Sequence, residues 1–385
     1  MTISNCLTSK ERVESVFAGQ IPDRPAIGFY AIDSDTAGKI LGRETYWRAK
    51  AKSQIGFWEG RRDEVVQSWI EDGIELYKKL DFIDVVPVCC ESAGVCPPKN
   101  CDPNPPKQID ESTWESKDGK VYRYSPITKD IVVIKNPSVK VGSIDLDKEK
   151  WDGKIIPPDG SIFEVVDAFI AAFGHDRFVL GPAADELAWF LPGSMETGFM
   201  ELAMRPDQVK EAYLSKVAKA NAHDKYFVRL GQSGIIWGTD LACQNSPMLS
   251  PQMYSDLFFD GFSQRIASVK SLGQRVIKHM CGNNWPLLDM MAEAGIDCYQ
   301  SIQQSAGMDI AEVQRQYKEK FVVWGGLPVE YLIDGTTEDV RKAVRKVMTE
   351  VAPNGRFIFG TSHSIAVGTK YDNFMAMLDE LSHYI

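Results

Sequence analysis

Two residues with metal-binding side chains, His279 and Cys281, stand two positions apart after the apolar residues Val276 and Ile277. On an extended strand, side chains two positions apart point to the same face, so both residues can aim at one point beyond the strand end. Imidazole nitrogen and thiolate sulfur are ligands of soft or borderline cations, and zinc fits them best. The pair therefore predicts a metal site. The alternative is a buried cysteine beside a structural histidine.

The segments around this pair alternate between strand and helix patterns. Short apolar strands are expected at residues 24–30, 84–88, 178–180, 235–237, 276–279, 298–302, 321–324 and 357–359. A helical pattern follows each of them, and this alternation predicts a parallel sheet. Eight such units predict an α/β fold of the closed (β/α)8 TIM barrel type, with a doubly wound sheet as the alternative.

The alternation breaks between residue 89 and about residue 144. Prolines crowd the first part of this stretch, at positions 97, 98, 103, 105 and 106, and proline interrupts regular structure. Asp118-Gly119 predicts a hairpin turn, and residues 121–124 and 131–134 have the pattern of short strands. We therefore expect one barrel domain over residues 1–385, with an irregular insertion at about 89–144 after the second strand.

In a barrel, the residues that carry chemistry lie on the loops that follow the strands. The last strand runs into Gly360-Thr361-Ser362-His363, so His363 is expected on the same face as His279 and Cys281. The second strand runs into Cys89-Cys90-Glu91 on that face. Three nitrogen and sulfur ligands that converge on one face favour a metal site at the barrel mouth.

Aromatic and acidic side chains also gather at the strand ends. Barrel interiors mostly use branched aliphatic residues, so an aromatic lining favours a flat aromatic substrate, with core filling as the alternative. The candidates for substrate contact are Tyr30, Trp189, Trp237 and Trp324. Two carboxylates, Glu186 and Asp240, are candidate catalytic residues, and capping of the following helix is their alternative role.

The composition limits the classes of partner. The chain has a net charge of −10 and no basic cluster, so neither nucleic acid nor an anionic membrane is an expected partner. The most apolar run, Val165 to Phe173, is too short to cross a membrane and contains Asp167. Eight cysteines without a secretory signal indicate reduced thiols in the cytoplasm. Cys96 and Cys101 are either ordinary loop thiols or part of a second metal site.

Several motifs resemble the uroporphyrinogen decarboxylase superfamily. They are Leu7–Val13, Gln244–Pro251, His279-Met280-Cys281-Gly282-Asn283, Gly325–Leu327 and the ending from Phe359 to Met377. The similarity spans nearly the whole chain apart from the insertion. The His-x-Cys-Gly-Asn string is similar to the branch of cobalamin-dependent methyltransferases, which includes the first components of O-demethylases, and not to the decarboxylase itself.

The resemblance implies a set of metal ligands. In the methyltransferase branch, the residues that correspond to His279 and Cys281 bind zinc, with a third ligand near the C-terminus that is usually cysteine. This chain has His363 at that place. His363 is therefore the expected third ligand, and Cys243 and Glu186 are the alternatives.

The resemblance also implies substrate contacts and a partner. It places Asp240 and Gln244 at the mouth of the site, and Asn283 belongs to the metal-binding string. The chain lacks the Asp-x-His-x-x-Gly string with which corrinoid-binding domains hold cobalamin. Cobalamin is therefore expected on a separate corrinoid protein.

Two departures from the family indicate the reaction. The decarboxylase holds tetrapyrrole carboxylates with arginines after its first strand, and residues 28–33 contain none. A His-Cys-His site leaves zinc with a formal charge of +1, which makes it a better Lewis acid toward a neutral oxygen than a neutral His-Cys-Cys site. We expect zinc-dependent methyl transfer from a methoxylated aromatic compound, an O-demethylation, to the cob(I)alamin of a corrinoid protein. The alternatives are methyl transfer from methylcobalamin to a thiol such as coenzyme M, and a metal-free barrel that binds a tetrapyrrole.

Overall fold

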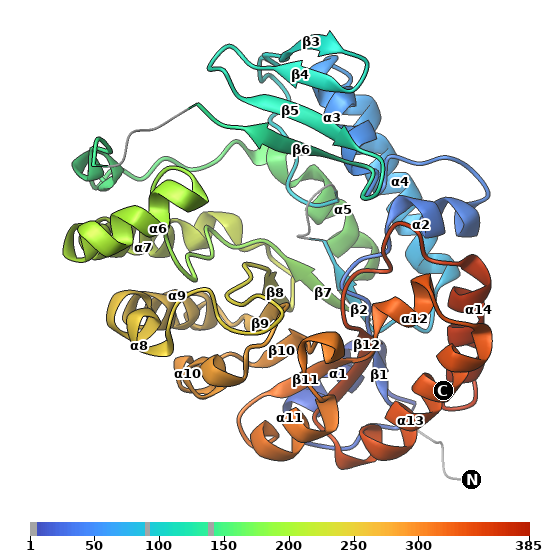
Figure 1. Ribbon diagram of the computed structural model, residues 1–385. Helices are drawn as coiled ribbons and strands as arrows, with labels where there is room; N and C mark the ends of the chain where they lie inside the picture. Colours follow the sequence, from blue (N-terminus) through green and yellow to red (C-terminus); the bar gives the residue numbers. More distant parts are fainter. Residues whose placement is uncertain (1–5, 89–92, 138–141) are drawn as a thin grey trace.

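Eight parallel strands form one sheet in the order β1-β12-β11-β10-β9-β8-β7-β2. We describe residues 6–88, 93–137 and 142–385 of a computed structural model (Figure 1). The strands are β1 Ala26–Ile27, β2 Val85–Pro87, β7 Phe178–Gly181, β8 Gly234–Trp237, β9 Arg275–Met280, β10 Cys298–Ser301, β11 Val322–Leu327 and β12 Phe357–Thr361. A parallel bridge between Gly28 and Val85 joins the two ends of the sheet and closes the barrel. The predicted TIM barrel is confirmed, with a strand at each expected place, and the doubly wound alternative is wrong.

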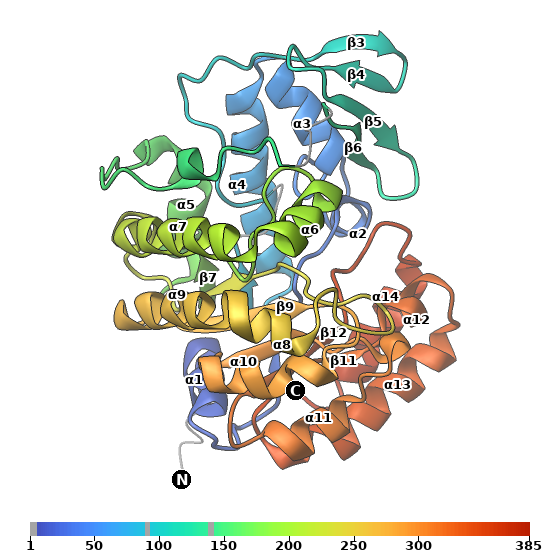
Figure 2. The ribbon, with the colours of Figure 1, turned by 60° about the vertical axis from the view of Figure 1, so that its left-hand side comes forward.

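Helices surround the barrel and follow the strands as expected; Figure 2 shows α7, α9, α10 and α11 stacked along one side. They are α1 Ser9–Phe17, α2 Ser34–Leu41, α3 Lys50–Trp58, α4 Arg62–Lys79, α5 Glu164–Phe173, α6 Met195–Met204, α7 Pro206–Phe227, α8 Pro251–Tyr254, α9 Asp260–Ser271, α10 Leu288–Ala294, α11 Ile310–Tyr317, α12 Val329–Ile333, α13 Thr337–Glu350 and α14 Tyr371–Leu381. None of the helices described is long and apolar enough to span a bilayer.

The N-terminal end of the barrel is closed by α1, which begins at a capping box between Thr8 and Glu11. Its side chains Val13 and Val16 pack in one cluster with inward-facing strand residues such as Ile277. The opposite, C-terminal end of the strands is therefore the end at which a site can open.

The layer above this cluster holds polar and aromatic side chains. His279 lies two positions after Ile277, so the alternation of the strand turns it toward the barrel axis. Gln300 is its register partner on β10, and Trp324 is the partner of Gln300 on β11. The indole of Trp324 fills the space beside Gly28, where an added Cβ would lie 2.9 Å from the ring.

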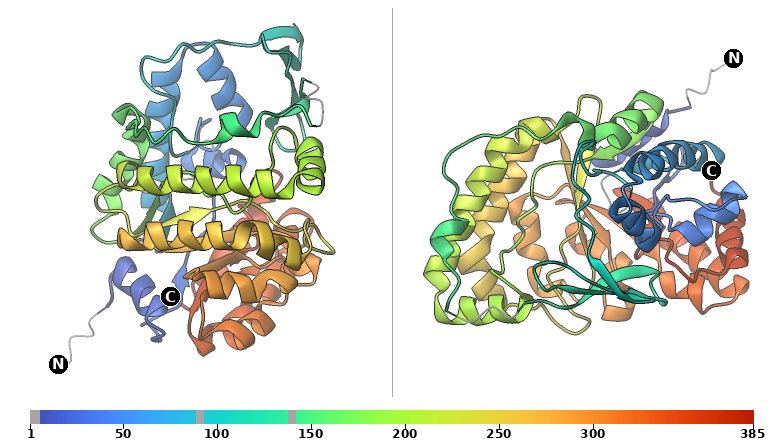
Figure 3. Two further views of the ribbon diagram at one scale, coloured as in Figure 1. Left: turned by 90° about the vertical axis from the view of Figure 1, so that its left-hand side faces the viewer. Right: turned by 90° about the horizontal axis from the view of Figure 1, so that it is seen from above.

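The insertion is more regular than expected. Residues 107–135 form an antiparallel sheet of β3 Lys107–Asp110, β4 Thr113–Glu115, β5 Val121–Ser125 and β6 Asp130–Lys135, which covers α3 (Figure 3). The proline cluster ends at Pro106, so it leaves this part of the chain free to pair. The predicted turn at Asp118-Gly119 is confirmed, since the Gly119 N–H bonds to the carbonyl of Ser116. The sheet rests on the barrel through Trp114, whose ring centroid lies 5.6 Å from that of Trp58 on α3.

Candidate metal centre

Three side chains predicted to bind a metal meet at the C-terminal mouth of the barrel. His279 is the penultimate residue of β9, Cys281 follows the strand directly, and His363 lies in the loop after β12. Each offers a ligand atom within 4.8 Å of the other two, and no other such trio occurs in the described parts of the chain. The Cys281 Sγ lies 3.4 Å from the His279 Nε2. Tetrahedral zinc with usual bond lengths would hold these atoms about 3.5 Å apart, so the ligand set fits zinc.

The imidazole of His279 is held in one tautomer. The Gln300 Nε2 donates a hydrogen bond to the carbonyl of Thr361 at 3.2 Å, which turns the Gln300 Oε1 toward the His279 Nδ1. Because this oxygen only accepts, the Nδ1 must carry the proton and the Nε2 must present its lone pair. Tyr30 stacks on the same ring, with centroids 4.3 Å apart. The lone pair is thereby aimed at Cys281.

The thiol of Cys281 lies between a hydroxyl and a carboxylate. Its Sγ is 3.5 Å from the Oγ of Ser301, and its backbone N–H donates to the Oδ1 of Asp240 at 2.7 Å. Ser301 and Ile302 have φ angles of +97° and +55°, unusual for residues with a branched or polar side chain. This strain turns the end of β10 so that the Ser301 hydroxyl reaches both the thiol and, at 2.6 Å, the carbonyl of Ser362.

The turn after Cys281 requires glycine. Gly282 has a φ of +84°, and a Cβ there would lie 2.6 Å from the carbonyl oxygens of Ala242 and Cys243. The buried amide of Asn284 donates to the carbonyls of Cys281 and Gly282, at 2.9 and 3.1 Å. The motif therefore fixes the position of the cysteine through its backbone.

The loop that carries His363 is tied to the first strand end. Its Nδ1 lies 3.0 Å from the Oγ of Ser364, and the hydroxyl of Thr361 donates to the carbonyl of His363 itself. Ile32 and Ile365 form a parallel bridge, and the Asp33 N–H donates to the Ile365 carbonyl at 3.0 Å. His363, in the loop after β12, is therefore held in place by the loop after β1.

Burial sets the protonation states of the three ligands. Burial, with the nearby charge of His363, lowers the pKa of His279 to about 3, against the opposing effect of the hydrogen bond that His279 donates to Gln300. Burial also lowers the pKa of His363. Burial and the charge of Asp240 raise the pKa of Cys281 to about 11. At neutral pH both imidazoles are ready ligands, while the thiol must lose a proton when a metal binds.

Several predicted residues lie at this site. Asp240 holds the Cys281 backbone and Tyr30 covers His279. Asn283 lies in the metal-binding turn, where its N–H donates to the Cys243 carbonyl at 2.9 Å. Gln244 is exposed on the loop after β8 and donates to the carbonyl of Ser305 at 3.3 Å.

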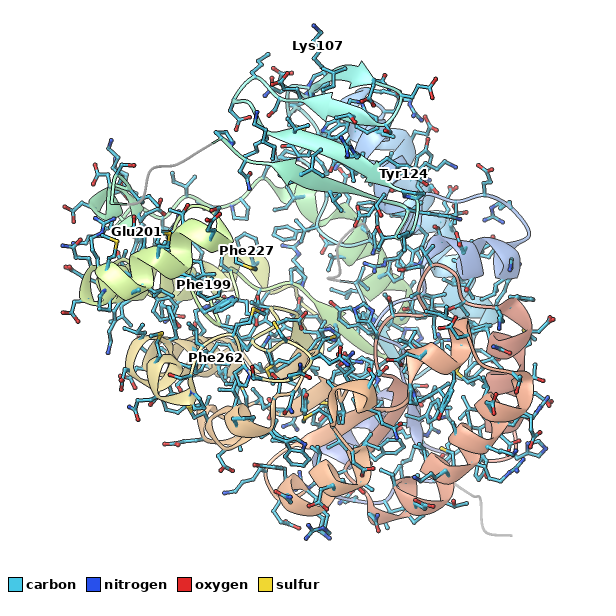
Figure 4. All side chains as sticks on the ribbon, in the orientation of Figure 1. Lys107, Tyr124, Phe199, Glu201, Phe227 and Phe262 are labelled. Atoms are coloured by element: carbon cyan, nitrogen blue, oxygen red, sulfur yellow. The ribbon has the colours of Figure 1, made fainter. Side chains whose placement is uncertain are left out.

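Other predicted residues are used elsewhere. Glu186 forms an ion pair with the buried Lys278 at 2.6 Å, and Cys243 is exposed; both lie outside the ligand trio. The side chain of Trp237 faces outward, because its neighbour Ile236 on β8 faces the barrel axis. The ring of Trp237 packs on that of Phe262 on α9; Phe262 is labelled in Figure 4. This orientation gives no support to the predicted substrate contact of Trp237.

The two remaining tryptophans also have structural contacts. Trp324 is fully buried and donates from its Nε1 to the Gly28 carbonyl at 2.9 Å, so it fills the barrel interior, which gives no support to its predicted substrate contact. Trp189 is half-buried, with its ring centroid 5.8 Å from that of Phe199 on α6. Cys96 is buried beside Arg62, and Cys101 is exposed. The expected contribution of Cys89-Cys90-Glu91 falls outside the residues that the structure describes.

Sequence reasoning missed the polar residues that support the ligands. Gln300 and Ser301 belong to a buried strand, and a glutamine at an inward position was the available signal. It also missed an ionic group near His363, in which the Arg48 guanidinium lies 3.0 Å from the Asp33 carboxylate. The positive charges of Lys50 and Arg48 reinforce the lowering of the His363 pKa by burial, while Asp33 and Asp240 oppose it.

Comparisons with known proteins agree with the fold. Residues 195–384, just under half of the chain, match the model of the family "Uroporphyrinogen decarboxylase (URO-D)", which agrees with the superfamily that the motifs indicate. A methyltransferase from Methanosarcina mazei has a similar structure, with a TM-score of 0.64, 13% identity, and coverage of 98% of this chain and 99% of the other. A second structure, of a 3-keto-D-glucoside 4-epimerase from E. coli, aligns over 57% of this chain and 83% of the epimerase chain at 10% identity. Its TM-score of 0.33 is too low to indicate a shared fold. No curated protein sequence matches the chain significantly.

Proposed function

We propose that this chain of the uroporphyrinogen decarboxylase superfamily is a zinc-dependent methyltransferase that demethylates an ether, most suitably a methoxylated aromatic compound. The methyl group passes to the cob(I)alamin of a separate corrinoid protein. The observation that carries the proposal is the cluster of His279, Cys281 and His363 at the barrel mouth, in which His279 is buried and the other two are partly buried. The structural similarity to a methyltransferase supports the same class of reaction.

The ligand set favours oxygen over sulfur as the atom that is activated. Two neutral imidazoles and one thiolate leave bound zinc with a formal charge of +1, and zinc of this charge supplies Lewis acidity toward an ether oxygen. A second cysteine in place of His363 would cancel that charge. This argument favours ether cleavage over transfer to a thiol, which needs zinc to hold a thiolate.

The residues of the chain provide the rest of the site. Gln300 and Tyr30 keep the Nε2 of His279 aimed at the centre of the ligand trio. Asp240 is the carboxylate whose charge acts on both Cys281 and His363. We assign Asp240 to hold the proton that the departing oxygen takes up, since Glu186 is engaged by Lys278.

The corrinoid partner must approach the open end of the barrel. The insertion sheet of β3–β6 stands at one side of the molecule, above α3 (Figure 1). We propose that this sheet borders the surface on which the corrinoid protein docks. A protein partner that brings the acceptor to the mouth explains why the chain needs no cobalamin-binding string of its own.

The test combines metal analysis with a methyl-transfer assay. Zinc-loaded protein is incubated with reduced free cob(I)alamin and with methoxyarenes, methylamines, methanol or methyl thiols, and the cobalt spectrum reports methylation. We expect about one zinc per chain and methylation from methoxyarenes. Full activity of metal-free protein, or methylation from thiols alone, would contradict the proposal.

Ligand variants sharpen the test. His279→Ala and Cys281→Ser should each lose zinc and methyl transfer while the fold persists, because both side chains lie in the mouth. Cys243→Ser, on the neighbouring loop, is the matched control and should keep both. Asp240→Asn should keep zinc and lose methyl transfer.

A further inference from the structure

A cavity of about 730 Å³ lies between α3, the start of α4 and the first part of the insertion. One part of its wall is aromatic, with Phe57 and Trp58 from α3 and Trp69 from α4, and the rest of the lining is mixed polar and apolar. The rings of Phe57 and Trp69 meet edge to face with centroids 5.4 Å apart. Pro97 and Pro103 of the insertion close the cavity from the other side. Such a space is large enough for a single-ring aromatic compound.

A chain of contacts joins this cavity to the metal centre. The loop of His363 is bonded to Asp33 through the carbonyl of Ile365. Asp33 pairs with Arg48, and two residues later Lys50 begins α3 and lines the cavity. Lys50 lines the cavity, and its positive charge also contributes to lowering the pKa of His363, so it lies near both the cavity and the metal centre.

The ammonium of Lys50 is poorly partnered. Its side chain is 22% exposed, and its charged neighbour, Asp130, lies 4.0 Å away. This separation is longer than a hydrogen bond, although an ammonium has three donors. A partly buried ammonium whose ion pair is this long favours an anionic ligand.

The other charged groups of the cavity are engaged. Arg62 and Lys99 both bind Glu164, at 2.8 and 3.0 Å. Among the carboxylates, Asp102 accepts the N–H of Asn104 at 2.9 Å. Aromatic walls also attract cations, but the cation that remains available on this wall is Lys50 itself, which would repel one.

We propose that this cavity binds the body of the methyl donor as a flat aromatic ring that bears a carboxylate. The ring lies against Phe57 and Trp58, and the carboxylate bonds to Lys50. The position of the methoxy group toward His363 rests on the proposed function. The binding of the aromatic carboxylate does not depend on it.

Calorimetry with the zinc-loaded protein tests this binding without any corrinoid. The probes are dimethoxybenzoate, dimethoxybenzamide and dimethoxybenzylamine with the same methoxy positions, so that only the charge differs. A charged hydrogen bond to Lys50 should make the benzoate bind about tenfold tighter than the amide, or more. Lys50→Met should abolish that preference, and Lys50→Arg should restore it.

The matched control is Lys52→Met. Lys52 lies on the same helix, but it bonds to Glu44 and covers the ring of Tyr46 outside this cavity. The control should keep the preference for benzoate. Where Lys50→Met does not fold, Lys50→Gln replaces it.

Each outcome of this experiment either supports or overturns the inference. A preference that survives Lys50→Met, tighter binding of the benzylamine, or no binding of any probe would overturn the inference. Methyl transfer is measured separately with cob(I)alamin. Selective binding without methyl transfer would refute the proposed function and leave the aromatic carboxylate site standing.

Discussion

Gln300 is the residue on which the geometry of the first ligand depends. Its amide is oriented by Thr361, so it accepts from the Nδ1 of His279 and leaves the Nε2 for the metal. Gln300→Leu removes this acceptor and should weaken zinc binding by about tenfold to a hundredfold, as loss of such supporting hydrogen bonds does elsewhere. Competition with a chromogenic chelator measures the affinity.

The control for this prediction separates orientation from packing. Gln300→Glu keeps an oxygen that accepts from the His279 Nδ1, so zinc affinity should stay near that of the parent protein. Gln244→Leu changes an exposed glutamine on the neighbouring loop and should have no effect. Equal zinc affinity in Gln300→Leu would show that the tautomer of His279 needs no support.

His363 sets the charge of the site. His363→Cys should still bind zinc, because thiolate is a strong ligand at about 2.3 Å, but the site would become formally neutral. If the barrier to ether cleavage rises by about 2–3 kcal/mol, demethylation slows by roughly thirtyfold to more than a hundredfold. Rates with ethers of graded leaving groups measure this, and the loss should be largest for the poorest leaving group. Unchanged rates in His363→Cys, or unchanged zinc affinity in His363→Ala, would show that His363 does not bind the metal.

The three ligands were predictable from sequence because their positions follow from chain direction alone. His279 and Cys281 share a strand face, and His363 follows another strand that ends at the same rim. The supporting residues depend on the register between strands. Gln300 faces His279 only because β9 and β10 pair at those positions, and a one-residue shift would turn it outward. For Trp237 the decisive feature is the alternation along β8, which places its side chain on the outer side of the sheet.

The barrel strands were predictable as elements because strands buried on both faces are continuous apolar runs. The insertion was harder to predict as a sheet: strand patterns were visible at residues 121–124 and 131–134, but β3 and β4 lack an apolar run. β3 is exposed along its whole length, and β6 is mostly exposed. Its turn was nevertheless identifiable, since Gly119 has a φ of +83° that few residues other than glycine tolerate.

The insertion sheet should be removable as an element. Replacing residues 107–135 with a short glycine-serine linker keeps Cys96 and Pro97, which are bonded to Ile162 and Arg62. The change loses the ring contacts of Trp114 and Tyr122 with Trp58 and the bond from the Ala51 N–H to the Lys129 carbonyl. It also loses the partly exposed ion pairs Lys129–Asp35 and Lys50–Asp130, which contribute little. The free energy of unfolding should therefore fall by about 1–2 kcal/mol. Thermal unfolding and zinc content measure the effect.

The ring contact of Trp114 with Trp58 can be removed alone as a control. Trp114→Ala in the full chain should lower the free energy of unfolding by a similar amount. The shortened protein should retain zinc but lose methyl transfer to the corrinoid protein more than to free cob(I)alamin. Collapse of the fold would show that the sheet is part of the folding unit.

At the scale of the whole molecule, the barrel holds a titratable group where water does not reach. The floor formed by α1 and the layer of Trp324 lie below His279, and the loops after β1 and β12 lie above it. His279 is 3% exposed. The closed architecture that prepares the ligand also makes its protonation incompatible with the native fold.

The stability of the metal-free protein should therefore depend on pH through His279. Burial, reinforced by the charge of His363, lowers the pKa of His279 from 6.5 to about 3, so the unfolded chain binds a proton between these values while the folded chain does not. The contribution of neutral His279 to the free energy of unfolding is complete above pH 6.5, the pKa in the unfolded chain. It is lost as the pH falls from 6.5 toward 3, the pKa in the folded chain. Between about pH 7.5 and about pH 5.5, linkage predicts that the free energy of unfolding falls by about 1.4 kcal/mol because of this group.

Urea unfolding of the metal-free protein at both pH values measures this difference. His279→Gln should reduce the difference by about that amount and leave the part that belongs to His363, whose pKa burial also lowers. His175→Gln, at a histidine whose side chain is 73% exposed, should leave the difference unchanged. An equal pH dependence in His279→Gln would mean that other groups carry the effect and that this imidazole is protonated as easily inside the barrel as outside it.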